Sequence, residues 1–149
     1  MAQTYIGSTL RTGSGTLTDT TDGGYVVLSQ SVEVTSLAAG TAASGTLTLP
    51  ANSQIVNIFV DKVQTQVVGG GTASTLPCLV GSTAGGGEYV PSVDMFTTVR
   101  SNGVMTVATL AAMDDIGSNT TVYCTVDPNG TISTTQAKIL FTVVYSQKV

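Results

Sequence analysis

The chain has 149 residues, the length of one ordinary domain, and a net charge of −4 with only 9% charged residues. Because 42% of the residues are hydrophobic, the composition excludes disorder driven by charge repulsion. The scattered positions of the five basic residues exclude the basic patch of a nucleic-acid-binding protein; they are Arg11, Lys62, Arg100, Lys138 and Lys148. A surface this poor in charge indicates packing against other protein.

The first 24 residues differ from the rest of the chain. Threonine, glycine and serine dominate them, and few apolar side chains could anchor them: Tyr5, Ile6, Leu10 and Leu17. We therefore expect an extended N-terminal arm over residues 1–24 that gains order from a neighbour, followed by a single domain over residues 25–149. The start has no basic segment followed by an apolar run, so we expect no signal peptide. The sequence has no stretch of about 18 apolar residues, so we expect no membrane partner.

From residue 25 onward the apolar residues alternate as they do in β-strands. Strands are expected over residues 25–34, 44–49 and 53–66. In the third of these, alternation predicts one face formed by Val56, Ile58 and Val60. The opposite, mixed face would carry Ile55, Asn57, Phe59 and Asp61.

Further short strands are expected over residues 74–80, 93–99 and 104–110. Breaks rich in glycine, proline or asparagine separate the expected strands, at Gly40, Pro50, 69–71, 85–87 and Asn102-Gly103. The segment 104–116 is ambiguous, because some of its apolar residues also recur at helical spacing. A strand followed by an irregular or one-turn helical piece is favoured there over a helix.

The last third of the chain contains the strongest turn signal. Asp-Pro-Asn-Gly at residues 127–130 separates an expected strand at 120–126 from an alternating C-terminal strand, and it predicts a hairpin between the two. In the C-terminal strand, one face is expected to carry Ile139, Phe141, Val143 and Tyr145. Seven or eight short strands at this spacing predict an all-β fold, an antiparallel β-sandwich of the jelly-roll kind.

Most catalytic arrangements are excluded by composition. The chain has no histidine, which removes Ser-His-Asp and Cys-His catalysis and any histidine-based zinc site. Cys78 and Cys124 could form one disulfide if the fold brought them together. Because both lie in strand-like surroundings, buried free thiols are favoured. The glycines at residues 81–88 have the spacing of a phosphate-binding loop, but Gly87-Glu88 replaces the lysine and hydroxyl residue that such a loop needs. A loop between strands is favoured.

The remaining candidates are acidic and aromatic. Paired carboxylates occur at Asp114-Asp115 and at Asp19 and Asp22, and solvated loops are favoured over a glycosidase pair because the chain has no tryptophan to stack on sugar. Calcium binding at Asp19, Asp22 or Asp127 is a minor alternative. It is not favoured, because none of these residues has the ligand spacing of a known calcium-binding loop. The aromatic residues fall mostly on apolar strand faces and are expected in the core. No catalytic, cofactor-binding or metal-binding residues are predicted.

Three runs of sequence carry a resemblance. They are TLTLPANSQIVNIFVDKVQTQVV at 46–68, LPCLVGSTAGGGEYVPSVD at 76–94 and VYCTVDPNGTISTTQAKILFTVVYS at 122–146. Together they resemble the small β-sandwich structural proteins of tailed bacteriophages that decorate or cement the capsid. The resemblance covers about residues 25–146.

The resemblance implies a non-enzymatic virion protein on the capsid exterior, made in the host cytoplasm. Its expected partners are the major capsid protein and further copies of itself, as a homotrimer at local threefold positions of the shell. Monomeric and dimeric decorators fit the sequence equally well. No cofactor is expected. The alternative is a tail or head-fibre module that binds host-surface glycan.

Overall fold

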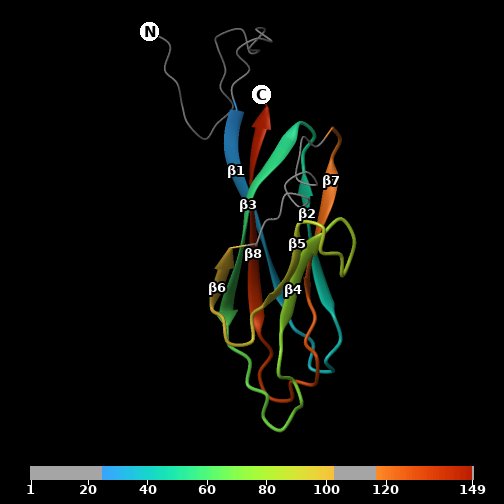
Figure 1. The fold of residues 1–149 in the computed structure, drawn as a ribbon, viewed down its shortest axis with the longest axis vertical. Coiled ribbons are helices and arrows are strands. Elements are labelled where there is room, and N and C mark those ends of the chain that lie inside the picture. Colours follow the sequence, from blue (N-terminus) through green and yellow to red (C-terminus); the bar gives the residue numbers. More distant parts are fainter. Residues whose placement is uncertain (1–24, 103–116, 149) are drawn as a thin grey trace.

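The computed structural model describes residues 25–102 and 117–148, which form an all-β molecule (Figure 1). Within them, eight strands make two antiparallel sheets of four strands each. The sheets pack face to face around one core, which confirms the predicted antiparallel β-sandwich. The arm expected at residues 1–24 and the ambiguous segment 104–116, with its expected strand at 104–110, lie outside the described residues.

Each sheet combines strands that are distant in sequence. Sheet A contains, in spatial order, β1 (Tyr25–Thr35), β8 (Lys138–Lys148), β3 (Ser53–Gln64) and β6 (Arg100–Asn102). Sheet B contains, in spatial order, β2 (Ala43–Leu49), β7 (Thr120–Val126), β4 (Pro77–Gly81) and β5 (Val90–Asp94). The expected strands at 25–34, 44–49 and 120–126 are confirmed as β1, β2 and β7.

The core lies between the sheets and consists of their inward-facing side chains. The face predicted for the C-terminal strand is confirmed, because Ile139, Phe141, Val143 and Tyr145 are all buried. Other large side chains that are fully buried in the described residues include Leu49, Ile58, Val60, Leu76, Val80, Val90, Met95, Val122 and Ile132. Burial of this apolar area supplies the main driving force for folding.

Strand β3 departs from the expected alternation at one residue. Its pairing with β8 shifts register between Ile55 and Asn57, which marks a β-bulge. Ile55 is therefore buried, whereas Val56 is 48% exposed, the reverse of the predicted faces. Ile58 and Val60 are buried as predicted. Side chains alternate between the two faces of a sheet with a period of two. One inserted residue therefore reverses which residues point inward before the bulge, relative to those after it.

The hairpin predicted at residues 127–130 is wrong. Strands β7 and β8 lie in different sheets, so residues 127–137 cross from sheet B to sheet A. The Asn129 side chain accepts hydrogen bonds through Oδ1 from the backbone N–H groups of Ser74 (2.8 Å) and Thr75 (2.9 Å). These long-range bonds fix the turn residues against another loop, so the chain does not reverse onto β7.

The prediction of one continuous strand over residues 93–99 is also wrong. Strand β5 ends at Asp94, whose Oδ1 accepts hydrogen bonds from the backbone N–H groups of Leu76 (2.8 Å) and Phe96 (2.9 Å). The second bond turns the chain back at Asp94, in the manner of an Asx-turn. A loop then crosses from sheet B to β6 in sheet A. Two other boundaries differ slightly: β3 ends at Gln64 and β4 begins at Pro77.

Candidate functional site

The outward-facing side of sheet A is rich in apolar side chains. On its central strands, Phe59 lies opposite Thr142, Leu140 lies opposite Asp61, and all four are half-buried. Val27 on the edge strand β1 is 65% exposed, and Val63 near the C-terminal end of β3 is 54% exposed. We define the apolar face of sheet A as Val27, Val56, Phe59, Val63, Leu140 and Val144.

The outward-facing side of sheet B is dominated by hydroxyl groups. We define its hydroxyl face as Ser44, Thr46, Thr48, Thr121 and Tyr123, all exposed except the half-buried Tyr123. Ser44 Oγ is hydrogen-bonded to the Oγ1 of the buried Thr125 at 2.8 Å. Hydroxyl groups retain their hydrogen bonds to water, so this face is suited to solvent.

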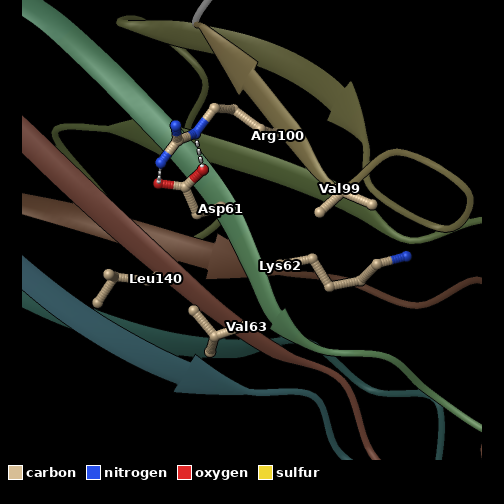
Figure 2. Close-up of a pocket in the computed structure, with 6 residues that line it drawn as sticks. All are labelled: Asp61, Lys62, Val63, Val99, Arg100 and Leu140. Carbon is tan, nitrogen blue, oxygen red and sulfur yellow. Dashed lines mark hydrogen bonds and ion pairs between the residues drawn. The ribbon is translucent and has the colours of Figure 1, made fainter.

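A hollow of about 410 Å³ lies at one end of the apolar face, where β3, β6 and β8 meet (Figure 2). Its lining residues are Asp61, Lys62, Val63, Val99, Arg100 and Leu140. Arg100 lies opposite Asp61 in the β3–β6 pairing and binds it with two hydrogen bonds, one from Nε to Oδ1 and one from Nη2 to Oδ2 at 3.1 Å. The valine side chains stay free for a partner, with Val99 66% exposed.

In the described residues, two ion pairs lie near the apolar face. Besides the pair of Asp61 and Arg100, Lys138 Nζ lies 3.3 Å from Glu33 Oε1. The hydrogen bond to Asp61 and the negative charge of that carboxylate raise the pKa of Arg100, so the guanidinium stays charged. A partner on this face therefore needs no complementary charge.

Lys62 sets the position of the rim of this hollow. Its side chain is only 8% exposed, and Nζ donates hydrogen bonds to the backbone oxygens of Met95 (2.9 Å) and Phe96 (2.8 Å). Gln66 Nε2 donates to the same Phe96 oxygen at 2.8 Å. The loop before β6 is thus held to β3, and Lys62 N donates a further hydrogen bond to the Val99 oxygen at 2.7 Å. This role of Lys62 was not predicted from the sequence, although the residue continues the inward alternation of Ile58 and Val60.

The side-chain carboxylate of Glu88 occupies the space inside the glycine-rich loop at residues 81–88. Glu88 Oε2 accepts a hydrogen bond from the backbone N–H of Ser82 at 3.0 Å. Backbone N–H groups of Glu88 itself and of Ser82 lower the pKa of this carboxyl. A Cβ atom at Gly81 or Gly86 would collide with Glu88 Oε2, so the glycines make room for the carboxylate. A phosphate would meet this negative charge, in agreement with the expected loop between strands.

The other chemical candidates are not gathered at one site. Asp19, Asp22 and Asp114-Asp115 lie outside the described residues, and Asp127 is exposed. Among the residues the structure describes, no three acidic or cysteine side chains form a group that could hold a metal ion. The aromatic candidates are divided, with Tyr89, Phe141 and Tyr145 in the core and Phe59 and Tyr123 on opposite outer faces.

The two cysteines are free thiols in the core. Cys78 lies on β4 and Cys124 on the adjacent β7, and both are fully buried. Burial raises the pKa of each thiol to about 12, so neither is a nucleophile at neutral pH. This agrees with the expectation of buried free thiols.

A thiol titration checks this arrangement. At pH 8 we expect almost no reaction of the native protein with a thiol reagent over minutes, because only about one thiol in ten thousand would be ionised and reagent is excluded from the core. In denaturant, both thiols should react at once. Fewer than two reactive thiols after denaturation, or a mass lower by two hydrogens, would contradict the assignment.

Comparisons with known proteins were made for the sequence and for the fold. No protein-family model and no curated protein matches the chain. A chain in the acidic stable capsid structure of Helicobacter pylori bacteriophage KHP30 is similar at 15% identity and a TM-score of 0.47, over 82% of this chain and 92% of that one. A chain in the capsid of Ralstonia phage GP4 is similar at 14% identity and a TM-score of 0.49, over 85% and 86%. At these values, any role must be argued from the residues of this chain.

In residues 25–102 and 117–148, no helix has the length and apolar character needed to cross a bilayer.

Proposed function

We propose that this chain is a non-enzymatic bacteriophage virion protein that binds the exterior of the capsid and reinforces it. The observation that carries the proposal is the contrast between the apolar face of sheet A and the hydroxyl face of sheet B. Exposed apolar surface marks a contact with another protein, while the hydroxyl face can remain in water. The resemblance to capsid-decorating proteins favours the capsid as the surface that is covered.

The size of the apolar face bears on how the protein would attach. Strands β1 and β8 have 11 residues each and β3 has 12. At about 3.3 Å per residue and 4.8 Å between strands, the whole outer side of the three strands measures roughly 500 Å², and this area includes exposed polar residues such as Ser29, Ser31 and Glu33. A stable interface buries about 800 Å² per partner, so one such face alone would bind weakly.

Multivalent attachment would overcome this weakness. A homotrimer presents three copies of the face, and binding of the first raises the effective concentration of the others. A trimer also matches the local threefold positions of an icosahedral shell. The proposed partners are therefore the major capsid protein and two further copies of this chain. The proposed location is the capsid exterior, after synthesis in the host cytoplasm.

Reconstitution tests the proposal. Purified protein mixed with undecorated heads should bind saturably and in many copies, and binding should survive about 0.5 M salt, where the Debye length is only a few ångströms. Salt should matter little because the charges beside the apolar face are already paired. Decorated heads should withstand more heating than bare heads. Absence of saturable binding, or saturation at about a dozen copies, would refute decoration.

The hydroxyl face favours a second candidate, a tail or head-fibre module that binds host-surface glycan. Tyr123 lies on this face opposite Thr46, and an aromatic ring among hydroxyl groups can contact a sugar. A glycan array separates the two roles. Specific binding that is lost in Tyr123→Ala would support the fibre module, whereas binding to heads with no glycan signal would support decoration.

A further inference from the structure

One outward-pointing side chain of sheet B is fully buried. On β7, the inward-pointing Cys124 and Val126 lie in the core, on either side of Thr125. Because side chains alternate along a strand, Thr125 points to the outer side of the sheet, as the exposed Thr121 does. Thr125 is nevertheless 0% exposed. A segment outside the two sheets must therefore cover it.

The loop between β4 and β5 lies over Thr125 (Figure 1). Gly85, in the middle of this loop, donates its backbone N–H to Thr125 Oγ1 at 2.9 Å. The same oxygen is hydrogen-bonded to Ser44 Oγ at 2.8 Å, so the loop reaches the hydroxyl face. We define residues 82–88 as the lid on the outer side of sheet B.

Two contacts join the beginning and the end of the lid. At its base, Tyr89 N donates to the Val80 oxygen at 3.0 Å. Further along the loop, Ser82 N donates to Glu88 Oε2, also at 3.0 Å. The chain is folded closely around this carboxylate, since a Cβ atom at Gly86 would collide with Oε2. The side chain of Glu88 thus holds the lid in its closed shape.

The backbone of the lid is suited to a change of shape. Residues 85–87 are three consecutive glycines, and Gly85 has φ +76°. Glycine adopts conformations with negative and positive φ at little steric cost, so other loop shapes are accessible. The pairing of β4 with β5 includes Val80 and Val90, which lie outside the lid. The lid can therefore move while both strands stay in place.

We propose that residues 82–88 are a lid that the ionised Glu88 carboxylate holds closed over sheet B and that opens when this carboxylate is protonated. Hydrogen bonds to an ionised acceptor are roughly twice as strong as those to a neutral one. Opening breaks the bond between Gly85 and Thr125 and adds the Thr125 hydroxyl to the hydroxyl face. The inference does not depend on attachment to a capsid.

The hydrogen bonds to the carboxylate set the direction of the pH effect. Backbone N–H groups of Glu88 itself and of Ser82 lower the pKa of the Glu88 carboxyl from its ordinary value of 4.5. Opening the lid removes these hydrogen bonds, so the pKa is higher in the open form. The ionised carboxylate therefore stabilises the closed lid above about pH 4.5, and this stabilisation is lost as the pH falls through the lower pKa of the closed form.

The other titratable groups on the surrounding strands do not act in this way. The carboxyl on β5, Asp94, lies opposite Pro77, at the end of the β4–β5 pairing away from the lid. The remaining groups are phenols and thiols, which are neutral in acid; they are Tyr89 beside Glu88, Cys78 on β4, and Tyr123 and Cys124 on β7.

Amide hydrogen exchange of the full-length protein, followed by NMR, tests the lid. Gly85 is the reporter, because its N–H binds Thr125 and not Glu88. Its protection factor, which corrects for the intrinsic effect of pH on exchange, should fall about tenfold between pH 6 and pH 3. The amides of the β3–β8 pairing should keep their protection, which shows that the sandwich stays folded. An unchanged protection factor of Gly85 would overturn the proposal.

Two carboxylate variants provide a matched pair. Glu88→Gln keeps the length of the side chain but carries no charge, so the protection of Gly85 should already be low at pH 6 and should not change with pH. Glu33→Gln removes an exposed carboxylate from sheet A and should behave like the unmodified protein.

Two results with Glu88→Gln would contradict the proposal. If exchange became faster at Ser82 alone, with Gly85 unchanged, Glu88 would bind its own loop without controlling the lid. If the protection of Gly85 still fell in acid, another group such as Asp94 would be responsible for the pH dependence.

Discussion

A carboxylate placed on the apolar face of sheet A should abolish attachment to phage heads without unfolding the protein. Val63 is 54% exposed and lines the hollow beside Leu140 and the ion pair of Asp61 and Arg100. In Val63→Asp the new carboxylate would be buried against the partner with no free cation, since Arg100 is already paired. An unpaired charge in an interface costs about 2–5 kcal/mol, so the affinity for heads should fall at least about thirtyfold.

The control places the same charge on the opposite face. Thr121 lies exposed on the hydroxyl face of sheet B, and Thr121→Asp should bind heads like the unmodified protein. Both substitutions are at exposed positions, so the free energy of unfolding should change by no more than about 0.5 kcal/mol. Co-sedimentation with undecorated heads measures the affinity. Equal loss in both variants would refute the apolar face as the attachment surface, and loss in Thr121→Asp alone would assign attachment to sheet B.

A large loss of stability is expected from Gly40→Ala. Gly40 lies in the loop between β1 and β2 with φ +71°, and a Cβ atom there would lie 2.6 Å from the backbone carbon and oxygen of Gly130. A side chain at positive φ costs about 1–2 kcal/mol, and pushing two backbone segments apart costs about 1–3 kcal/mol more. We expect the free energy of unfolding to fall by about 3 kcal/mol, measured by urea denaturation.

Gly85→Ala separates the two contributions. Gly85 has φ +76°, close to that of Gly40, but a Cβ atom added there would have no other atom within 4 Å. Only the conformational cost applies, so the loss should be about 1–2 kcal/mol. If the two variants were equally stable, the loop containing Gly40 would not be packed against the crossover containing Gly130.

Strand alternation made most of the fold predictable from sequence. Residues such as Ile139, Phe141 and Val143 recur at every second position, and a sheet with one buried face requires that pattern whatever its neighbours are. The lack of histidine in the sequence likewise excludes whole classes of catalysis, because no fold can supply a residue that the chain does not contain. The two free thiols were predictable from their apolar surroundings.

Local turn signals, in contrast, predicted the wrong structure where residues distant in sequence offer competing hydrogen-bond partners. Asp-Pro-Asn-Gly at 127–130 is a good hairpin turn in isolation, yet Asn129 binds the backbone of Ser74 and Thr75 and the chain crosses to the other sheet. Asp94 similarly ends a strand by binding the N–H groups of Leu76 and Phe96. Neither set of partners can be identified from the adjacent sequence.

The class of fold, the inward face of most strands and the absence of histidine chemistry follow from the sequence alone. Only the tertiary structure decided which strands share a sheet, and therefore that Phe59 and Leu140 meet on one outer face while Thr46 and Thr121 meet on the other. It also decided that Lys62 holds the loop before β6. The physical reason is that alternation acts along one strand, whereas a surface is assembled across strands whose pairing depends on long-range contacts.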